Sequence, residues 1–127
     1  MTHRDFTWLS AVELQILYAR NETSPVDVLE TFLGRARALQ PHLNALVLTD
    51  EAAARSAARA SEARWRSGTP LSLLDGIPTT IKDTTPVKGW PTRNGSRATD
   101  ETPAAESAPV VERLQRAGMV VVGKSTT

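Results

Sequence analysis

Apolar positions near the N-terminus repeat with helical spacing. Leu14, Leu17 and Tyr18 fall on one side of a helix and form a short apolar stripe. Ser10 and Glu13 precede this stripe at the three-residue spacing of a capping box, which satisfies free N–H groups at a helix start. The pattern therefore predicts a first helix that begins after Ser10.

A second helix is predicted from Ser24, because Pro25 then takes the first helical position, where proline is tolerated. Its apolar residues follow the helical period: Val26, Leu29, Phe32, Leu33 and Ala36. Pro41 is expected to end this helix, since proline lacks the N–H that a helix interior requires. A brief strand is predicted directly afterwards, over Leu46 to Leu48.

The segment 50–67 is rich in alanine and arginine, and Gly68 follows it. Oppositely charged residues four positions apart support a helix here, in the pairs Glu51/Arg55 and Glu62/Arg66. Because its apolar side is mostly alanine, this helix can approach a neighbour closely while burying little area. We expect its role to be structural.

The C-terminal half alternates between strand and helix signals. Apolar, β-branched runs predict strands over 79–82 and 119–122, the second buried on both faces and ending before Gly123. An irregular connection spans 83–106, and a helix is then predicted from about Ser107 to Gly118. Its inward residues are expected to be Val110, Val111, Leu114 and Ala117. This order predicts an α/β fold with a right-handed crossover between parallel strands.

Composition narrows the function without assigning one. With 127 residues, 40% hydrophobic and 23% charged, the chain is typical of a globular domain. A formal charge of +1 gives no reason to expect nucleic acid or an anionic membrane as partner. The absence of cysteine excludes disulfides and thiolate chemistry and suits the cytoplasm. His3 and His42 lack partners at metal-ligand spacing, and no apolar run reaches membrane-spanning length, so we expect no metal site and no membrane span.

Lys82 is the leading candidate for chemistry because it ends an apolar strand run. A lysine at that point is expected to be partly removed from water, and desolvation favours the neutral, basic form. A lysine that acts as a base near neutral pH needs its pKa lowered by roughly 3 units. Asp83 would oppose that change by favouring the ammonium. The residues alone leave open a structural alternative, in which Lys82 is solvated or paired in a salt bridge.

Three further residues are weaker candidates. Lys124 follows the second strand run, but the sequence around it lacks the upstream glycine of a phosphate-binding loop, so a strand-end turn is the better interpretation. Ser96 and Ser125 are the serines best placed for nucleophilic work, although both positions are more typical of turns or hydrogen bonding. Neither histidine lies near them in the sequence, so no Ser-His-Asp triad is predicted.

Four segments, in this order, resemble the amidase signature family. The first is Leu74-Asp75-Gly76-Ile77-Pro78-Thr79-Thr80-Ile81-Lys82-Asp83, which is similar to the segment that carries the family's catalytic lysine. The others resemble its next loop, crossover helix and succeeding strand: Gly89 to Arg97, Ala108 to Gly118 and Val120 to Thr127. The N-terminal helix pair also fits, so the resemblance spans essentially the whole chain.

The resemblance implies a fold of N-terminal helices followed by the first strands and crossover helix of a mixed β-sheet that is covered by helices. Residues 1–127 would form the N-terminal part of a single amidase domain, helical over 1–67 and entering the α/β core over 68–127. Members of the family cleave or transfer carboxamides through a Ser–Ser–Lys triad, without metal or cofactor. Lys82 would be the base, the substrate a small amide, and the complete enzyme a cytoplasmic protein that can form a homodimer.

The family's bridging serine, nucleophile and oxyanion donors all lie C-terminal to the position of Thr127. Loss of oxyanion donors alone costs several kcal/mol, roughly 3 to 4, in the transition state. We therefore expect this chain to supply a catalytic lysine and to show no amidase activity by itself.

Two other functions compete with a general amidase. The amidase-like subunit of a tRNA-dependent amidotransferase shares the same motifs, but the residues after Gly123-Lys124 depart from the Thr-Asn-Met pattern expected there, and no basic patch argues for tRNA. A non-catalytic remnant or binding module that uses the loop 83–106 is the alternative from another class. Such a module should fold alone, whereas a partial domain should expose apolar surface.

Overall fold

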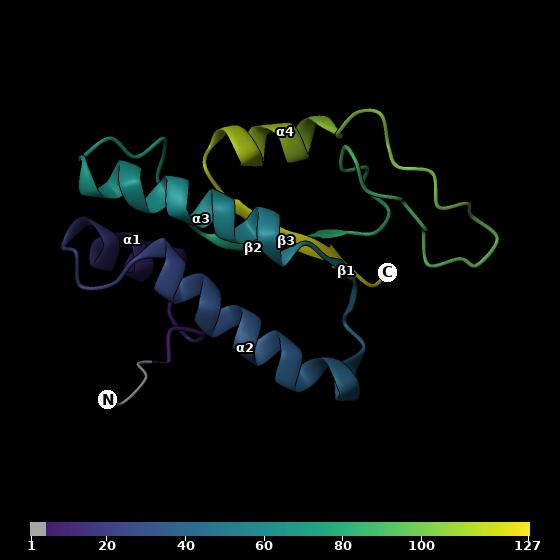
Figure 1. The fold of residues 1–127 in the computed structure, drawn as a ribbon, viewed down its shortest axis with the longest axis horizontal. Coiled ribbons are helices and arrows are strands. Elements are labelled where there is room, and N and C mark those ends of the chain that lie inside the picture. Colours follow the sequence, from purple (N-terminus) through teal and green to yellow (C-terminus); the bar gives the residue numbers. More distant parts are fainter. Residues whose placement is uncertain (1–4) are drawn as a thin grey trace.

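The computed structural model describes residues 5–127, and His3 lies outside them. Four helices and three strands follow one another along the described chain (Figure 1). In order they are α1 (Ala11–Ala19), α2 (Pro25–Leu43), β1 (Leu46–Thr49), α3 (Glu51–Arg66), β2 (Pro78–Lys82), α4 (Pro109–Arg116) and β3 (Val120–Ser125).

The strands form one small mixed sheet in the order β1-β3-β2. β3 lies in the centre, antiparallel to β1 and parallel to β2. The ladder between β2 and β3 is irregular, because Thr79 pairs with Val121 whereas Thr80 pairs with Gly123. Val122 is therefore an extra residue in β3, and such a bulge changes which side of the sheet the following residues face. The predicted α/β class with a parallel strand pair is confirmed.

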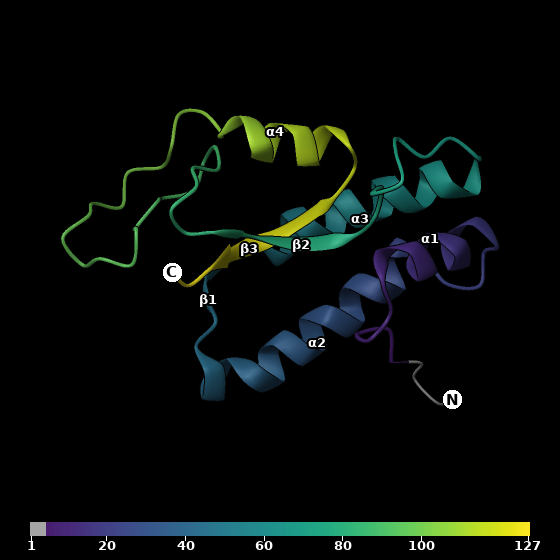
Figure 2. The same ribbon diagram turned by 180° about the vertical axis from the view of Figure 1, so that it is seen from behind.

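Helices cover both faces of this sheet, as the two opposite views show (Figures 1 and 2). On one face, α2 and α3 pack against β3 through a cluster of buried residues: Leu29, Leu33, Ala54, Ala58, Val120 and Val122. On the other face, α4 and the following loop region enclose a second cluster: Ile81, Val87, Val111 and Val121. The sheet end that carries Lys82 is therefore positioned between two separate apolar layers.

α1 completes a third cluster beside α2 and the start of β2, formed by Phe6, Leu14, Leu17, Tyr18, Val28 and Ile77. The predicted capping box is present, because Ser10 Oγ accepts from the Glu13 N–H while Glu13 accepts from the Ser10 N–H. The predicted cap of α2 is also present, with Ser24 Oγ accepting from the Asp27 N–H at 3.1 Å. These local signals start both N-terminal helices where the sequence places them.

The prediction that Pro41 ends the second helix is wrong. α2 continues through Pro41 to Leu43, and Asn44 then turns the chain with a left-handed φ of 46°. The Asn44 N–H donates to the Gln40 carbonyl at 2.8 Å, and the Gln40 side chain binds both backbone groups of Leu46. Because a proline so near a helix end sacrifices few bonds, this cap decides where α2 stops.

Two predictions in the C-terminal half also need correction. β3 runs on to Ser125, because Gly123 and Lys124 still pair with Thr80 and Ile81 of β2. Val110 does not point inward as the pattern predicts, since 54% of its surface is exposed, and Val111 is the fully buried residue of α4. A helix of 8 residues has room for only a narrow inward stripe, so neighbouring valines cannot both face the sheet.

Candidate active site

The candidate site lies where β2 and β3 end and the loop 83–106 begins. Since the two strands are parallel, their carboxyl ends meet at one edge of the sheet, and this edge is where α/β proteins commonly bind ligands. Lys82, the last residue of β2, pairs in register with Ser125, the last residue of β3. The topology thus brings two of the candidate residues together.

Lys82 is exposed, so the expectation that it is partly removed from water is wrong for this chain. Side chains alternate along a strand, and Thr80 and Lys82 therefore face one side of β2 while Ile81 and Asp83 face the other. Ile81 belongs to the cluster beneath α4, which places Lys82 on the side of α2. No element among residues 5–127 covers the end of that face.

Lys124 is the lysine that is buried here, on the side of the sheet opposite Lys82. Its ammonium Nζ lies 3.1 Å from Asp83 Oδ1, and both side chains are at most 1% exposed. Nζ also donates to the Pro91 carbonyl at 3.3 Å and to Thr92 Oγ1 at 3.1 Å. The expectation that Asp83 holds a proton on Lys82 is wrong, because its carboxylate turns away to form a buried ion pair with Lys124.

The same carboxylate holds the following loop. Asp83 Oδ1 accepts from the Arg93 N–H at 3.3 Å, and the Asp83 carbonyl accepts from the Asn94 N–H at 3.1 Å. Asp83 Oδ2 is buried and has no hydrogen-bond partner among residues 5–127. A buried carboxylate oxygen in that condition is costly unless another group reaches it.

The loop 91–97 forms a tight turn beside the end of β3. Asn94 and Gly95 have left-handed φ angles of 54° and 68°, in agreement with the turn that the sequence predicts. Ser96 belongs to this turn, since its N–H donates to the Arg93 carbonyl and its Oγ accepts from the Ala98 N–H. Ser96 is therefore a structural residue here, as the residue pattern favours.

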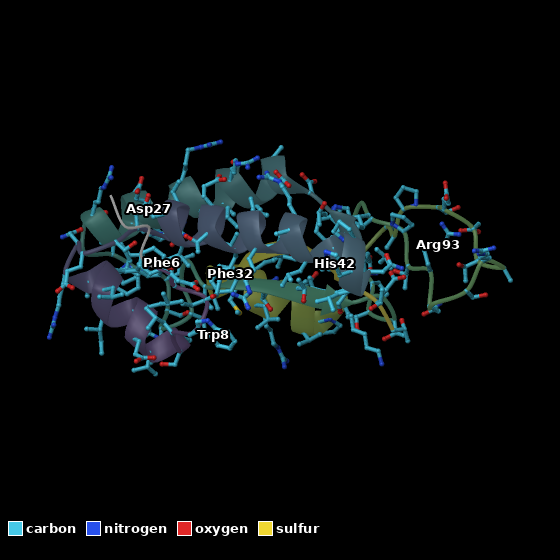
Figure 3. All side chains as sticks on the ribbon, turned by 90° about the horizontal axis from the view of Figure 1, so that it is seen from below. Phe6, Trp8, Asp27, Phe32, His42 and Arg93 are labelled. Atoms are coloured by element: carbon cyan, nitrogen blue, oxygen red, sulfur yellow. The ribbon has the colours of Figure 1, made fainter. Side chains whose placement is uncertain are left out.

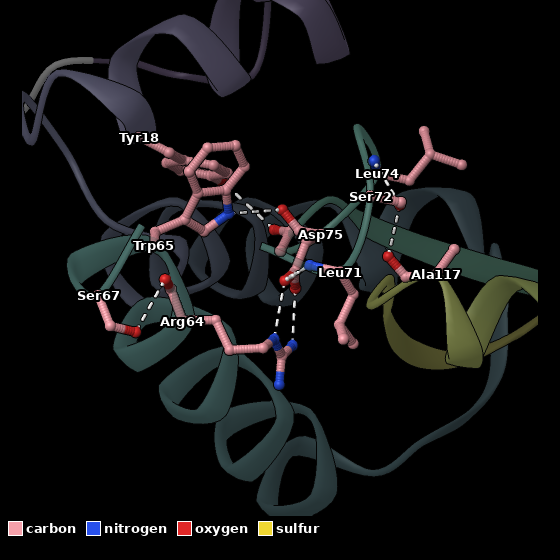
Figure 4. A network of polar contacts seen from close by, with 10 residues as sticks. Tyr18, Arg64, Trp65, Ser67, Leu71, Ser72, Leu74, Asp75 and Ala117 are labelled. Carbon is pink, nitrogen blue, oxygen red and sulfur yellow. Dashed lines mark hydrogen bonds and ion pairs between the residues drawn. The ribbon is translucent and has the colours of Figure 1, made fainter. Parts of the chain in front are cut away.

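A second ion pair fixes the chain in front of β2 (Figure 4). Arg64 of α3 donates two hydrogen bonds to Asp75, at 2.8 Å and 2.7 Å, and the Leu71 N–H donates a third at 2.8 Å. Burial raises the pKa of the Asp75 carboxyl, but these hydrogen bonds outweigh it and hold the pKa below its usual value. Arg64 remains 27% exposed at its side chain, so this pair is only partly screened by water.

Glycine is required at the start of the Gly-Ile-Pro segment. Gly76 has a φ of +82°, and a side chain there would approach Ser61 Oγ to 2.6 Å and Pro25 Cγ to 2.7 Å. Its carbonyl accepts from the Tyr18 hydroxyl at 3.2 Å, and its N–H donates to the Gly118 carbonyl at 2.9 Å. β2 therefore begins from a point that α1, α3 and β3 hold together, which fixes the direction in which Lys82 emerges.

The described residues hold no group of three or more His, Cys, Asp or Glu side chains that could bind a metal ion. His42 is an exposed residue in the last turn of α2 (Figure 3). None of the described helices is both long enough and apolar enough to cross a membrane.

Comparison with known proteins identifies the family. Residues 27–127 match the family model described as Amidase. The acylamidase of Rhodococcus erythropolis is 39% identical over 128 residues, which cover 100% of this chain and 27% of the relative. A glutamyl-tRNA(Gln) amidotransferase subunit from Salinispora arenicola is 40% identical over 121 residues, which cover 95% of this chain and 25% of the relative.

Solved structures agree with this assignment. A crystal structure of an amidase superimposes with a TM-score of 0.83 at 40% identity, covering 93% of this chain and 27% of the other. The peptide amidase of Stenotrophomonas maltophilia superimposes with a TM-score of 0.86 at 28% identity, covering 94% and 25%. The chain thus spans about a quarter of the length of the relatives it matches. It belongs to the amidase family, the amidase signature family that its motifs resemble.

Proposed function

We propose that this chain supplies the lysine base of an amide-cleaving site, and that Lys82 is that base. Membership of the amidase family supports amide chemistry. The observation that carries the assignment to Lys82 is its place at the carboxyl end of β2, exposed on a strand whose start and end are both held by buried polar contacts. The other strand-end lysine, Lys124, already has a carboxylate partner and two further acceptors.

The proposed chemistry is a Ser–Ser–Lys relay that uses side chains alone. A neutral Lys82 Nζ accepts a proton from a bridging serine, which accepts the proton of a nucleophilic serine as that oxygen attacks the amide carbon. The C–N bond then breaks, the amine leaves with the relayed proton, and water releases the acyl group. This chain contributes the proton acceptor at Lys82, and the serines come from the part of an amidase domain that this chain does not contain.

An exposed ammonium keeps its proton near neutral pH, because water stabilises the charged form. Lys82 can therefore act as a base only when another polypeptide covers it and removes that water. For the same reason we propose that the chain alone does not hydrolyse amides.

A second candidate function is that of the amidase-like subunit of an amidotransferase. The 40% identity to the Salinispora arenicola protein supports it. The residues Ser125-Thr126-Thr127 after Lys124 favour the general amidase instead, because that subunit is expected to have Thr-Asn-Met there. The two functions share the same proposed role for Lys82 and differ in whether the released amine is discharged to water or passed on to a second acceptor.

A chimera tests the role of Lys82. Residues 1–127 would replace the aligned N-terminal segment of the Rhodococcus erythropolis acylamidase, and amide hydrolysis would be measured. We expect Lys82→Ala to lower kcat/KM by at least about a thousandfold, as loss of a catalytic group typically does. Lys82→Arg should be equally impaired, because a guanidinium does not release its proton.

Lys88→Ala is the matched control, since Lys88 is an exposed lysine six residues further along the same loop. It should leave hydrolysis unchanged. If the Lys82→Ala chimera kept full activity, the proposed base would be wrong. Hydrolysis by the isolated chain that survives Lys82→Ala would contradict both the role of Lys82 and the expected inactivity.

A further inference from the structure

An apolar groove of about 380 Å³ lies between the C-terminal half of α2 and the edge of the sheet. Its principal lining residues are Trp8, Phe32, Leu39, Leu43, Leu46 and Thr80. Two of these side chains are largely in water, since Trp8 is 78% exposed and Leu43 is 63% exposed. Figure 3 views the molecule from the side of α2 and shows Trp8 and Phe32 on this face. Exposed apolar side chains gathered along one groove are typical of a surface that another polypeptide covers.

The groove is continuous with a sheet edge that has no partner strand. β2 is the last strand in the order β1-β3-β2, so within residues 5–127 only β3 pairs with it. Thr80 both lines the groove and lies in β2, which joins the two features at one residue. An uncovered edge strand offers backbone groups for pairing with another chain.

The direction of Lys82 selects which face of the sheet a catalytic partner must occupy. Lys82 lies two residues beyond Thr80 and therefore shares its face, the face of the groove. The opposite face at this level is closed by the Asp83–Lys124 pair and by the loop at Pro91 and Thr92. A serine hydroxyl within hydrogen-bond distance of Lys82 Nζ can therefore arrive only from the groove side.

We propose that the groove and the free edge of β2 form one docking surface, and that its occupant is the serine-bearing remainder of an amidase domain. This inference rests on the proposed function of Lys82. The length of the relatives supports it, because this chain accounts for about a quarter of an amidase. The occupant adds a strand beside β2, covers the apolar groove and removes water from Lys82.

A second copy of this chain fits the surface less well. An isologous contact places the same residues of both copies against each other, which would bring the cationic side chains of Arg35 and Lys82 together. Arg35 lies over the Trp8 ring, with its guanidinium carbon 5.0 Å from the ring centroid, so this charge stands at the groove itself. Like charges facing each other across a contact oppose association.

Thiol labelling tests the proposal, because the chain contains no cysteine. Thr80→Cys and Leu43→Cys place a thiol on the docking surface, and Leu73→Cys is the matched control at a residue that is 73% exposed just before β2. Maleimide labelling at each position would be followed by peptide mass spectrometry, in the isolated chain and in the acylamidase chimera. We expect the first two thiols to react at least tenfold more slowly in the chimera, and the control to react equally in both. Equal reactivity of all three thiols would overturn the proposal.

A second arm decides the question if the chimera does not fold. The acylamidase without its aligned N-terminal segment would be coexpressed with tagged residues 1–127, and soluble complex would be measured after affinity capture. We expect recovery with the unaltered chain, a loss of at least tenfold with Thr80→Glu/Leu43→Glu, and no loss with Leu73→Glu. No recovery with the unaltered chain, or equal recovery with every variant, would count against the docking surface. So would self-association of the isolated chain that Leu43→Glu abolishes.

These readouts do not depend on turnover, so they separate the docking surface from the role of Lys82. Protection of Thr80→Cys in a chimera whose activity survives Lys82→Ala would uphold the surface and refute the base. Loss of activity in Lys82→Ala together with unprotected thiols would uphold the base and refute the surface.

Discussion

Replacing Lys124 by methionine should destabilise the chain strongly, although methionine fits a buried site of similar length. The substitution removes the ammonium that lies 3.1 Å from Asp83 Oδ1 and leaves a carboxylate that is 1% exposed without its partner. It also leaves the Pro91 carbonyl and Thr92 Oγ1 without the donor that they share. Three buried acceptors therefore lose one cation.

The expected loss can be bounded from two sides. Breaking a buried ion pair by removing one partner costs about 3–5 kcal/mol in known cases. The carboxyl can escape by taking up a proton, which for an ordinary aspartic acid at pH 7 costs about 3.1 units, or roughly 4.2 kcal/mol. We therefore expect Lys124→Met to lower the free energy of unfolding by about 3–4 kcal/mol.

Urea unfolding at pH 7, followed by tryptophan fluorescence, measures this loss. The double variant Asp83→Asn/Lys124→Met removes both charges and should recover at least about 2 kcal/mol, because no isolated charge stays buried. Lys88→Met is the control for an exposed lysine and should change stability by less than about 0.5 kcal/mol. A loss under about 1 kcal/mol for Lys124→Met, or no recovery in the double variant, would refute the buried pair.

Three further changes are predicted from the structure. Gly118→Ala should cost about 2–4 kcal/mol in urea unfolding, because its Cβ would collide with Asp75 Oδ1 at a φ of +91°, whereas Gly34→Ala, with nothing within 4 Å, should stabilise α2 by about 0.5–1 kcal/mol. Ser10→Ala removes a helix cap and should cost about 1 kcal/mol by the same measurement; no change would show that the capping box is unimportant. Because the folded pKa of Asp75 is lowered, its contribution is complete above the unfolded value of about 3.9 and disappears as the pH falls through the folded value, so Asp75→Asn should be less stable at pH 7 and should approach the unaltered chain near pH 2; an unchanged difference would contradict this.

Local signals predicted most of the helices and strands. The caps at Ser10 and Ser24 act on the N–H groups of the next turn, so their effect can be recognised without the rest of the fold. The end of β3 could not be predicted in this way. Gly123 and Lys124 continue the strand because β1 and β2 both pair with β3, and such pairing involves residues far away in the sequence.

The two strand-end lysines show a similar limit at the site. Lys82 and Lys124 each follow an apolar run, and the sequence pattern gives no reason why one should be exposed and the other buried. The extra residue in β3 at Val122 decides this, since it turns Lys124 to the side of Ile81 and Asp83. The sequence pairs Asp83 only with its neighbour Lys82, whereas the sheet register gives it a partner on the adjacent strand.

The Asp83–Lys124 pair has a geometric effect that apolar residues of the same size would not reproduce. Lys124 joins β3 to Pro91 and Thr92, while Asp83 joins β2 to the Arg93 and Asn94 N–H groups. A buried ion pair is weak evidence for stability, but this one ties a single loop to the ends of both strands. It therefore holds the backbone at Lys82 from the opposite face of the sheet.

Amide hydrogen exchange can separate this positioning effect from stability. In Asp83→Asn/Lys124→Met the core should persist, so the Val120 N–H, which donates to the Ile77 carbonyl at the start of the strands, should exchange as slowly as before after correction for global stability. The Asn94 N–H donates to the Asp83 carbonyl and should exchange at least tenfold faster once its loop is released. Equal protection of Asn94 in both proteins would show that the turn at 91–97 holds itself, and that the buried pair does not position the strand end that carries Lys82.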